Sequence, residues 1–492
     1  MLLPASAPLP QPTTASSFSL ISLNVLLPNS HDGWWIYKYY PPSVAAAETT
    51  WSARSRLLEE LLLIADADII CLQECCAASF ESDFSFLQRA GYAASLLGKG
   101  RMRPATLWKT SRFALCDAAG APAPPPPETP PHETTTDAEG PAAAGHDGGG
   151  AADAEECEWA ALPATRGVAV TQGDRTLITT LHLLGEDGSP RGTPPLFVVN
   201  CHLTAGQEAR RRLSQVHDAL DRVRKQRAKA LPKGHDPRAP CVVCGDFNSQ
   251  GSTAVRELLL RGEVLPSFRE SGDPTERDQA GTALTSKPKR QGVGAFTDVY
   301  ERVEGGCGPT LVAPTLQPLM QREDGGVTDL LRAALAEAFL TLSADGETLS
   351  LEEQRRWLVA VNKEEGRGSE WRAAAAAREV RGSDSLDLHA FVGVYEAEVA
   401  QGKFWGVEHD LRVLRGEGVA QHGAPPFTAT FDYLYCSDAI EVLGVRAPLD
   451  RGEPRAEALL KGESWLPNEW HASDHLPVGA ALAFAPKRSG SE

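Results

Sequence analysis

Short apolar runs, many of them ending in a polar residue, recur along the chain. Runs of roughly four to eight residues rich in Val, Ile, Leu and Phe predict buried strands, and apolar residues at helical spacing predict helices. The expected strands cover residues 18–26, 69–72, 105–109, 168–170, 177–183, 197–203, 242–245, 431–436 and 479–484, and the expected helices cover 51–65, 79–90, 206–227 and 252–261. Strands and helices alternate without the regular repeat of a barrel, so the pattern favours a layered α/β fold.

Two segments depart from this pattern. Residues 119–158 consist mainly of Pro, Ala, Gly, Thr and acidic residues, which cannot bury enough apolar surface to fold, so we expect a disordered loop between neighbouring strands. Residues 325–416 show helical periodicity and predict an inserted all-α module. The main domain is then expected to comprise residues 17–118, 159–324 and 417–486, with disordered ends at 1–16 and 487–492.

The formal net charge of −17 argues at first against a polyanionic ligand. Residues 119–160 hold nine acidic and no basic residues, and residues 329–415 hold 16 acidic against 11 basic residues, which leaves −3 for the rest. Within that rest, residues 210–233 gather nine Lys or Arg. We favour a solvated helix packed through its apolar face, formed by Leu213, Val216, Leu220 and Val223, over a track for phosphates.

Polar residues that follow the apolar runs carry the candidate chemistry. They are Asn24 in SLNVLL, Glu74 in LQE, His202 in NCHL, Asp246 and Asn248 in GDFNS, Asp432 in FDYLY, and Asp474 and His475 in SDHLP. Such carboxylates, amides and imidazoles, brought together at strand ends, suit one hard divalent cation, an oriented water and a phosphate. The pattern therefore predicts a hydrolase site.

In their order, the six motifs resemble the endonuclease/exonuclease/phosphatase (DNase I-like) superfamily, nearest its carbon catabolite repressor deadenylase and nocturnin branch. The resemblance runs roughly from residue 17 to 484. It implies a four-layer α/β sandwich in which two mixed sheets pack face to face beneath outer helices. It also implies Mg²⁺-dependent hydrolysis of a phosphate ester by in-line attack of water, with Mn²⁺ as a substitute ion.

The resemblance assigns the metal ion to Asn24, Glu74 and Asp474. Glu74 follows the buried-looking run 69–72, where a carboxylate is costly unless it is paired or bound to metal. Asn24 is expected beside the ion, where its amide orients the water shell.

The same resemblance assigns the chemical step to a second set of residues. Asp246 is the base that activates water or, in a two-metal description, a metal ligand, and Asn248 binds phosphate or fixes the water. Asp432 is expected to hold one nitrogen of His475, so that the other nitrogen stabilises charge on the phosphate. His202 resembles the phosphate-facing histidine of the family.

Likeness to deadenylases implies a 3′→5′ exoribonuclease that acts on single-stranded RNA. The alternative substrate is a small phosphate ester, such as a dinucleotide 2′-phosphate, a 2′,5′-linked oligonucleotide or an inositol phosphate, clamped by Arg101, Arg103 and Lys109. Least favoured is a non-catalytic, calcium-responsive binding protein, because a scaffold has no need to bury this many charges. The sequence holds no leucine-rich docking repeats, so assembly into a large deadenylase complex is not expected.

The inserted helices resemble a degenerate EF-hand pair. Ser343, Asp345, Glu347 and Glu353 supply part of a calcium loop, but the loop is one residue short and its turn glycine is displaced. A second candidate loop, residues 382–391, has Ala where the closing Glu belongs. Calcium binding is therefore doubtful, and a purely structural insertion is favoured.

Ten cysteines are scattered along the chain. The lone Cys241-x-x-Cys244 pair favours buried, reduced thiols over zinc, because a zinc site needs two further ligands at matching spacing. No apolar run has the length of a membrane span, and the first residues lack the basic start of a secretory signal. We therefore expect a cytoplasmic protein, with a nuclear location as the alternative.

Overall fold

The computed structural model describes residues 2–3, 9, 16–116, 170–230, 240–271, 283–303, 306–420, 426–450 and 452–486. The loop expected at 119–158 and the tail at 487–492 lie outside the described residues. In the N-terminal segment, Leu2–Leu3 form strand β1 beside Val445 and Arg446, and Leu9 is buried. Disorder over the whole of 1–16 was therefore the wrong expectation.

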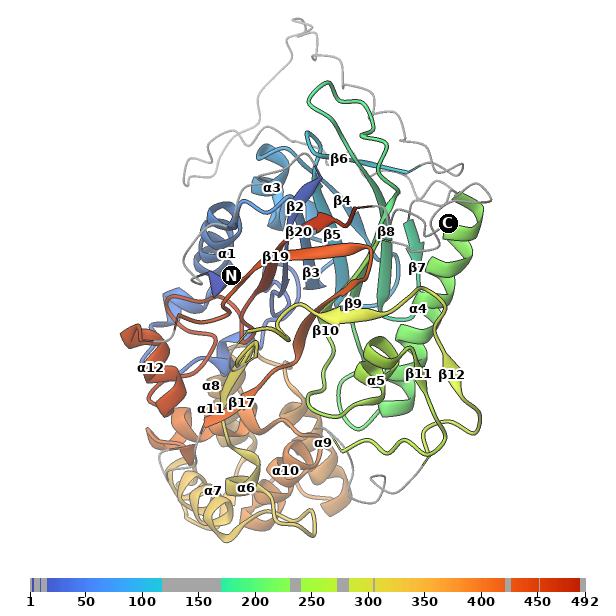
Figure 1. Cartoon of the computed structure of the whole chain (residues 1–492). Helices are drawn as coiled ribbons and strands as arrows, with labels where there is room; N and C mark the ends of the chain where they lie inside the picture. The colour runs from blue at the N-terminus through green and yellow to red at the C-terminus, as the bar shows by residue number, and fades with distance from the viewer. Residues whose placement is uncertain are drawn as a thin grey trace, which may run out of the picture.

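Two seven-stranded mixed sheets form the centre of the molecule (Figure 1). The first has the order β1, β19 (Ile440–Arg446), β20 (Val478–Phe484), β2 (Ser17–Asn24), β3 (Ile69–Cys75), β5 (Arg103–Lys109) and β4 (Tyr92–Leu96). The second has the order β13 (Phe296–Asp298), β18 (Asp432–Ser437), β10 (Cys241–Asp246), β9 (Leu196–His202), β8 (Thr176–Leu183) and β6 (Phe113–Leu115), with β7 (Val170–Gln172) also paired to β8.

Strand β3 shows why the runs are apolar at consecutive positions. Ile69 and Cys71 belong to the core between the two sheets, and Ile70 and Leu72 belong to the core beneath the outer helices. A strand buried on both faces has no solvent side, so it loses the alternation of apolar and polar residues.

Helices cover the outer face of each sheet. Helix α1 (Trp51–Ala65) packs through Leu58 and Leu62 on the first sheet, and α4 (Ala209–Ala230) and α5 (Ala254–Arg261) pack through Val216, Leu220 and Leu258 on the second. Figure 1 shows α1 and α4 on opposite sides of the paired sheets. The arrangement is helix, sheet, sheet, helix, which confirms the four-layer α/β prediction.

The shorter elements complete this frame. They are the 3₁₀ helices η1 (Ile36–Tyr39) and η2 (Ala46–Thr49), the helices α2 (Phe80–Asp83), α3 (Ser85–Arg89), α6 (Gln317–Met320) and α12 (Pro454–Lys461), and the strand pairs β11 (Glu263–Val264) with β12 (Lys289–Arg290) and β14 (Leu311–Pro314) with β17 (Pro426–Ala429). The single helix expected over 79–90 is thus two short helices.

Several basic residues of helix α4 form ion pairs with nearby aspartates. Arg211 pairs with Asp174 at 3.3 Å, and Arg224 and Lys225 pair with Asp221 at 2.7 and 2.6 Å. The predicted apolar face is buried against the second sheet. These pairings favour the solvated helix over a phosphate track.

The helical module comprises α7 (Asp329–Leu342), α8 (Leu351–Asn362), α9 (Ser369–Arg381), α10 (Leu388–Ala400) and α11 (Phe404–Arg415). It has an apolar core of its own, in which the Trp357 and Phe391 rings lie 4.7 Å apart. Two short strands, β15 (Thr348–Leu349) and β16 (Leu386–Asp387), pair antiparallel between the two helix–loop–helix units.

The candidate calcium loop is closed by its own hydrogen bonds. Asp345 accepts hydrogen bonds from the Thr348 and Glu347 backbone amides at 2.8 and 2.7 Å, which lower its pKa. Glu353 accepts from Ser350 and from Ala344 N, and forms the capping box of α8. These carboxylate oxygens accept hydrogen bonds from donors within the loop. This hydrogen bonding disfavours calcium binding there, which the sequence already made doubtful.

The module docks on the main domain through η1. Lys38 is 5% exposed and its Nζ lies 3.3 Å from Glu370, 3.1 Å from Asp410 and 3.0 Å from the Asn362 amide oxygen. Burial by itself lowers the pKa of Lys38, but the two carboxylates raise it above its ordinary value. A buried cation held by groups from three helices ties the module to the segment that precedes the first helix of the main domain.

Among the described residues, none of the helices combines the length and the apolar character needed to cross a bilayer.

Candidate active site

Strand ends from both sheets meet at one edge of the sandwich. Strands β2 and β3 run parallel, as do β9 and β10, so Asn24, Glu74, His202 and Asp246 lie at carboxyl-terminal strand ends. Asp432 begins the antiparallel neighbour β18 directly opposite Asp246. These residues are spread over about 400 positions of the sequence, and the sheet registers bring them together.

Asp246 lies at the centre of the site and is 1% exposed. Its Oδ2 accepts hydrogen bonds from the Asn24 and Asn248 side-chain amides at 3.1 and 3.0 Å, and its Oδ1 accepts one from Asn248 N at 2.8 Å. The Asn24 bond joins the two sheets. Burial raises the pKa of Asp246, and the nearby Asp432 adds to the effect while His475 and His202 oppose it.

The turn after β10 requires glycine before this aspartate. Gly245 has φ +123°, and a Cβ there would lie 2.0 Å from the Cys201 carbonyl oxygen. The backbone of β10 therefore approaches β9 more closely than any other residue type permits. This contact explains why the motif begins with Gly.

Glu74 occupies an irregular point of β3. It has φ +62°, unusual for a residue with a side chain, and the pairing register with β5 shifts between Leu72 and Cys75. Its Oε2 accepts a hydrogen bond from Leu27 N, and its Oε1 accepts one from the Asn24 amide, both at 3.1 Å. The bulge turns the carboxylate from the sheet toward the site.

The structure places Asn24 as a donor to the two carboxylates. Its Oδ1 accepts a hydrogen bond from Leu26 N at 3.0 Å, so the oxygen faces its own turn while Nδ2 faces Glu74 and Asp246. In this arrangement the residue holds the carboxylates in position, where the sequence predicted a neighbour of the metal ion.

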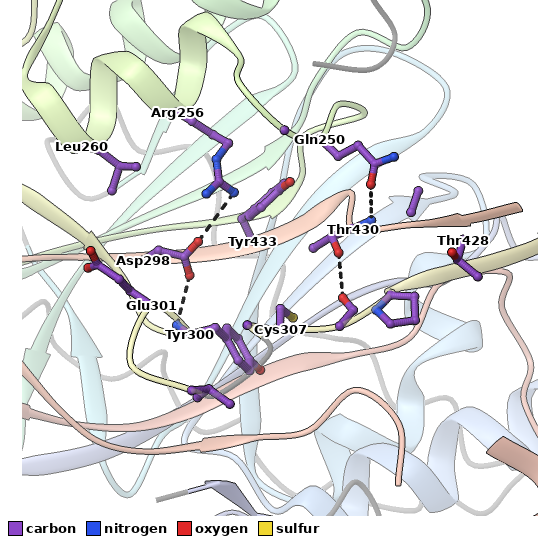
Figure 2. Close-up of a pocket in the computed structure, with 16 residues that line it drawn as sticks. Gln250, Arg256, Leu260, Asp298, Tyr300, Glu301, Cys307, Thr428, Thr430 and Tyr433 are labelled. Carbon is purple, nitrogen blue, oxygen red and sulfur yellow. Dashed lines mark hydrogen bonds and ion pairs between the residues drawn. The ribbon is translucent and has the colours of Figure 1, made fainter. Parts of the chain in front are cut away.

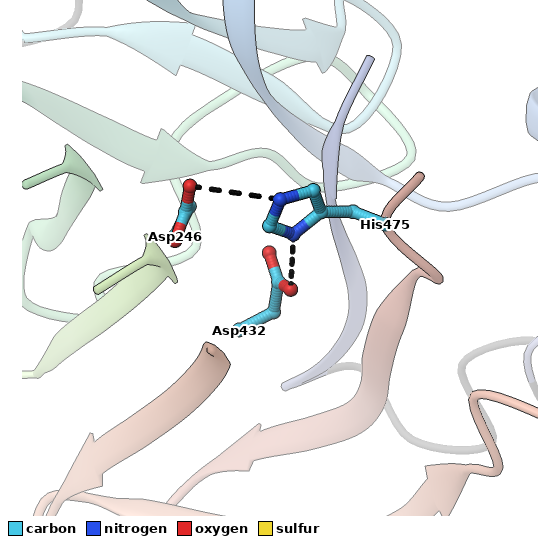
Figure 3. A group of neighbouring side chains, drawn as sticks. All are labelled: Asp246, Asp432 and His475. Carbon is cyan, nitrogen blue, oxygen red and sulfur yellow. Dashed lines mark hydrogen bonds and ion pairs between the residues drawn. The ribbon is translucent and has the colours of Figure 1, made fainter. Parts of the chain in front are cut away.

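Asp432 and His475 form the buried pair that the motifs predict. Figure 3 shows His475 between two carboxylates, with Nδ1 2.7 Å from Asp432 Oδ2 and Nε2 3.9 Å from Asp246 Oδ2. Burial by itself lowers the pKa of His475, but Asp432, Asp246 and Asp474 together raise it well above its ordinary value. A charged imidazolium is therefore held at the centre of the site.

His202 also lies close to Asp246. Its Nε2 is 3.6 Å from Glu74 and 3.8 Å from Asp246, and its Nδ1 lies 3.4 Å from the Met102 carbonyl oxygen. Asn248 Nδ2 also donates to Leu203 O at 3.0 Å. Both side chains are thus held against the central carboxylate.

Arg54, which sequence reasoning missed, supports the site from beneath. The guanidinium is fully buried and donates to the carbonyl oxygens of Val25, Leu26, Leu27 and Ala472. It joins the turn after β2 to the loop that carries Asp474 and His475. The sequence feature that could have revealed this role is an arginine on the apolar face of the helix predicted over 51–65.

A second buried bridge crosses between the sheets. Gln73 Nε2 donates to Asn200 Oδ1 at 2.8 Å, and Asn200 Nδ2 donates to the carbonyl oxygens of Leu72 and Ala105. Both residues belong to predicted motifs, but there they are the sequence neighbours of the residues assigned to catalysis. The bridge fixes one strand end relative to the other.

The donor set suits a hard divalent cation. Asp246 and Asp432 each place a carboxylate oxygen within 4.8 Å of the other and of a His475 ring nitrogen, and Asp432 Oδ1 is buried without a hydrogen-bond partner among the described residues. Burial raises the pKa of Asp474, and the charges of Glu74 and Asp246 raise it further. Carboxylates that repel one another in a buried site are stabilised when a cation binds.

The predicted phosphate clamp does not assemble. Lys109 ends β5, its Nζ pairs with Asp66 at 2.7 Å, and six residues separate it from Arg103, which is about 20 Å along a strand. Arg103 donates to the carbonyl oxygens of Gly100 and Leu97. Arg101 is paired with Asp32 and 55% exposed, so the three side chains form no common clamp and including Lys109 was wrong.

A separate pocket of about 610 Å³ lies on the far side of β18 from His475. Figure 2 shows its polar side chains paired with one another: Arg256 with Asp298 at 3.6 Å, and Gln250 with the Thr430 amide at 3.0 Å. Among the described residues, the group of acidic and histidine side chains suited to a metal lies in the site above, outside this pocket.

The four-layer fold and a buried cluster of carboxylates around a histidine suit a hydrolase of phosphate esters. The chain belongs to the endonuclease/exonuclease/phosphatase family, whose model matches residues 21–475. The family predicted from the six motifs is thereby confirmed. Its members are phosphoesterases and nucleases that typically depend on a divalent metal.

Three solved structures are among those that match this chain. ANGEL2, described as a 2′,3′-cyclic phosphatase, is 15% identical with a TM-score of 0.47, and the match covers 95% of each chain. The human Nocturnin catalytic domain with bound sulfate is 14% identical (TM-score 0.36; 96% of this chain and 95% of that one). Truncated Caenorhabditis elegans TDP2 is 12% identical (TM-score 0.34; 95% and 98%). No curated protein sequence matches this chain significantly.

Proposed function

We propose that this protein is a Mg²⁺-dependent phosphodiesterase that removes nucleotides from the 3′ end of single-stranded RNA. One observation carries the proposal: Asp246 lies between two histidines, and a protonated His475 is held against it by Asp432. This arrangement offers a base for water and a cation for phosphate within one hydrogen-bonded group.

Asp246 is the base in this proposal. Burial raises the pKa of Asp246 above its ordinary value, so its carboxylate accepts a proton from water more readily than an exposed aspartate does. The two amides of Asn24 and Asn248 hold the carboxylate in one orientation. As the new O–P bond forms, the proton of the attacking water moves to a carboxylate oxygen of Asp246. The bond from phosphorus to the 3′ oxygen of the preceding nucleotide breaks, and that oxygen leaves and takes up a proton from solvent.

The two histidines act on the phosphate. His475 donates through Nε2, because Asp432 accepts the proton of Nδ1 at 2.7 Å. Charge that accumulates on the non-bridging oxygens is stabilised by this imidazolium. His202 provides a second imidazole beside Asp246.

Glu74 and Asp474 are the residues that we assign to the cation, with Mg²⁺ the natural ion and Mn²⁺ its substitute. A bound cation supplies charge neutralisation of the phosphate and of the leaving oxygen. Leu27 N and the Asn24 amide hold Glu74 at a strained backbone position. Arg54 holds the loop that carries Asp474.

A small phosphate ester is the second candidate substrate. Arg101 favours it, because this exposed guanidinium lies next to Met102, whose carbonyl oxygen contacts His202. A terminal phosphate held by Arg101 would lie close to the catalytic histidine.

End-labelled substrates separate these candidates. The protein is incubated with 3′-extended oligoadenylate, mixed-sequence RNA, single-stranded DNA and a panel of phosphomonoesters, in Mg²⁺ or in EDTA. The proposal expects stepwise shortening of RNA from the 3′ end in Mg²⁺ alone, and a loss of at least about 100-fold in kcat for Asp246→Asn. Phosphate release from monoesters without RNA shortening would overturn the ribonuclease assignment. Full turnover by Asp246→Asn would overturn the site.

A further inference from the structure

A cavity of about 560 Å³ lies where the helical module meets the main domain. One wall is the segment that contains Trp34, Trp35 and Tyr39, and the opposite wall is formed by the α8–α9 loop, α9 and α11, including Trp405. The volume falls in the range of roughly 300–1,000 Å³ found for cavities that bury small ligands. Neither the main domain nor the module encloses this space alone.

The cavity adjoins the catalytic group at two points. Burial raises the pKa of Tyr39, and the charges of Asp474 and Glu74 raise it further, so this ring lies within electrostatic reach of the proposed metal ligands. Arg101 lines the cavity, and the next residue, Met102, contacts His202 through its carbonyl oxygen at 3.4 Å. The Arg101 end of the cavity therefore lies toward the reaction centre.

The aromatic rings of the lining form flat surfaces. Tyr39 stacks on Trp405 with a centroid distance of 5.4 Å and an interplanar angle of 18°. Trp34 and Trp35 are half-buried on the same side of the cavity. Planar groups that remain partly accessible suit a flat heteroaromatic ligand, because each base presents a π-face for stacking.

The lining of the cavity is rich in cationic side chains. They are Lys38, Arg101, Arg367, Arg372 and Lys403, and four of them pair with carboxylates: Lys38 with Glu370 and Asp410, Arg101 with Asp32, Arg367 with Glu364 and Lys403 with Glu398. Arg101 lies 4.6 Å from the Trp35 ring centroid, and Arg367 lies 5.6 Å from that of Trp34. Arg372 is exposed and makes no ion pair with another described residue, so its guanidinium is the lining group best suited to a phosphate.

The base of the cavity is polar as well. Glu398 is 3% exposed, and its Oε1 has no hydrogen-bond partner among the described residues, while Oε2 accepts from Ser369 and Lys403. A buried carboxylate oxygen without a donor is costly, and a ligand N–H group would satisfy it. Nucleobases carry such N–H groups at their edges.

We infer that this cavity, between the Trp34–Tyr39 segment and the helical module, binds one nucleotide of a single-stranded nucleic-acid substrate. The base stacks on Trp405, the phosphate meets Arg372, and the adjoining phosphodiester extends past Arg101 toward the catalytic group. The inference rests on the proposed function and gives the inserted module a role in substrate selection.

Filling the cavity tests the inference without removing a structural contact. Gly406 lies inside α11 with an ordinary φ, and a Cβ there would meet only Lys38 Cδ, at 4.0 Å. Gly406→Leu therefore occupies the cavity and is compatible with the helix. Gly393→Leu, in α10 and outside the cavity, is the matched control, because a Cβ there meets nothing within 4 Å.

The measurement is fluorescence anisotropy of a fluorescein-labelled oligoadenylate hexamer, with the full chain in EDTA so that no hydrolysis occurs. Gly406→Leu and Trp405→Ala should weaken binding roughly tenfold or more, the value of one lost base stack. Arg372→Gln should lower the slope of log K against log salt by roughly 0.7, the effect of one lost phosphate contact on a single strand. Gly393→Leu should bind as the wild type does, and melting curves of all variants verify that they fold.

Each outcome separates this inference from the proposed function. If Gly406→Leu, Trp405→Ala and Arg372→Gln all bind the hexamer as the wild type does, the cavity is only the joint between module and domain, and the inference is overturned even where RNA is hydrolysed. If the wild type binds the hexamer in EDTA, loses that binding in the variants and hydrolyses no RNA in Mg²⁺, the inference holds and the proposed function fails.

Discussion

Replacing Asp432 by Asn removes the charge that holds His475 protonated while keeping the size of the side chain. The two groups are buried and their Oδ2 and Nδ1 atoms lie 2.7 Å apart. A hydrogen bond to a charged partner contributes about 1.5–3 kcal/mol, and each 1.36 kcal/mol is a factor of ten in rate, so kcat should fall about 10- to 150-fold.

The pH dependence of this variant has a definite sign. The carboxylates raise the pKa of His475 well above its ordinary value, and the protonated form is the one that stabilises the phosphate. Without the Asp432 charge, the imidazolium loses its proton at lower pH, so the descending alkaline limb of the rate profile should move to lower pH.

The assay is kcat for a hydrolysed substrate measured from pH 5 to 10, beside Asp438→Asn as the control. Asp438 is an exposed aspartate directly after β18, so its variant should keep the wild-type profile. An Asp432→Asn profile that coincides with that of the wild type, at equal kcat, would refute the assignment of His475 as a charged donor.

Three further predictions concern stability and are read from urea unfolding. Lys38→Met leaves Asp410 buried without its cation and should lower the unfolding free energy by about 3–5 kcal/mol, whereas a loss below about 1 kcal/mol would contradict the docking scheme. Gly245→Ala should cost roughly 3 kcal/mol or more, because its Cβ meets Cys201 O at a positive φ, and an unchanged midpoint would contradict that backbone path. Burial lowers the pKa of His471 from 6.5 to about 4, so the unfolded chain binds the extra proton and stability should fall by about 3 kcal/mol as pH drops from 6.5 to 4. His471→Gln should lose that dependence, and a wild-type stability that rises over the same interval would show the sign to be wrong.

Much of the main domain could be predicted because its strands are buried on both faces. The runs at 69–72, 177–183 and 242–245 have no alternative environment in a soluble chain, and the structure has strands at each. Strands β4 and β19 were not predicted. In β19 the exposed Glu441 interrupts the apolar run of Ile440–Arg446, so the pattern of a buried strand is lost.

The chemical residues could be named from the sequence, but their contacts could not. Asp432 and His475 follow from the motifs, whereas the backbone turn at Glu74 depends on a bulge that periodicity does not reveal. Lys109 was placed in the clamp because it is near Arg103 in sequence. Along an extended strand, however, the two side chains lie about 20 Å apart, since each residue advances the chain by about 3.3 Å.

The joint between the two parts was beyond sequence reasoning. Residues 34–39 show neither helical nor strand periodicity, yet they hold Lys38 against the module and line the cavity. The partners of Lys38, Glu370 and Asp410, lie more than 300 residues further along the chain. Only the packed structure shows that such distant charges meet.

The Mg²⁺ dependence of RNA hydrolysis by Glu74→Gln tests the central claim most directly, namely that the buried carboxylates hold a divalent cation for phosphate ester hydrolysis. Glu60→Gln, on the exposed side of α1, is the control. EDTA should abolish wild-type hydrolysis, and Glu74→Gln should need at least about tenfold more Mg²⁺ for half-maximal rate. Hydrolysis that persists in EDTA, or a Glu74→Gln titration that coincides with those of the wild type and Glu60→Gln, would contradict the account.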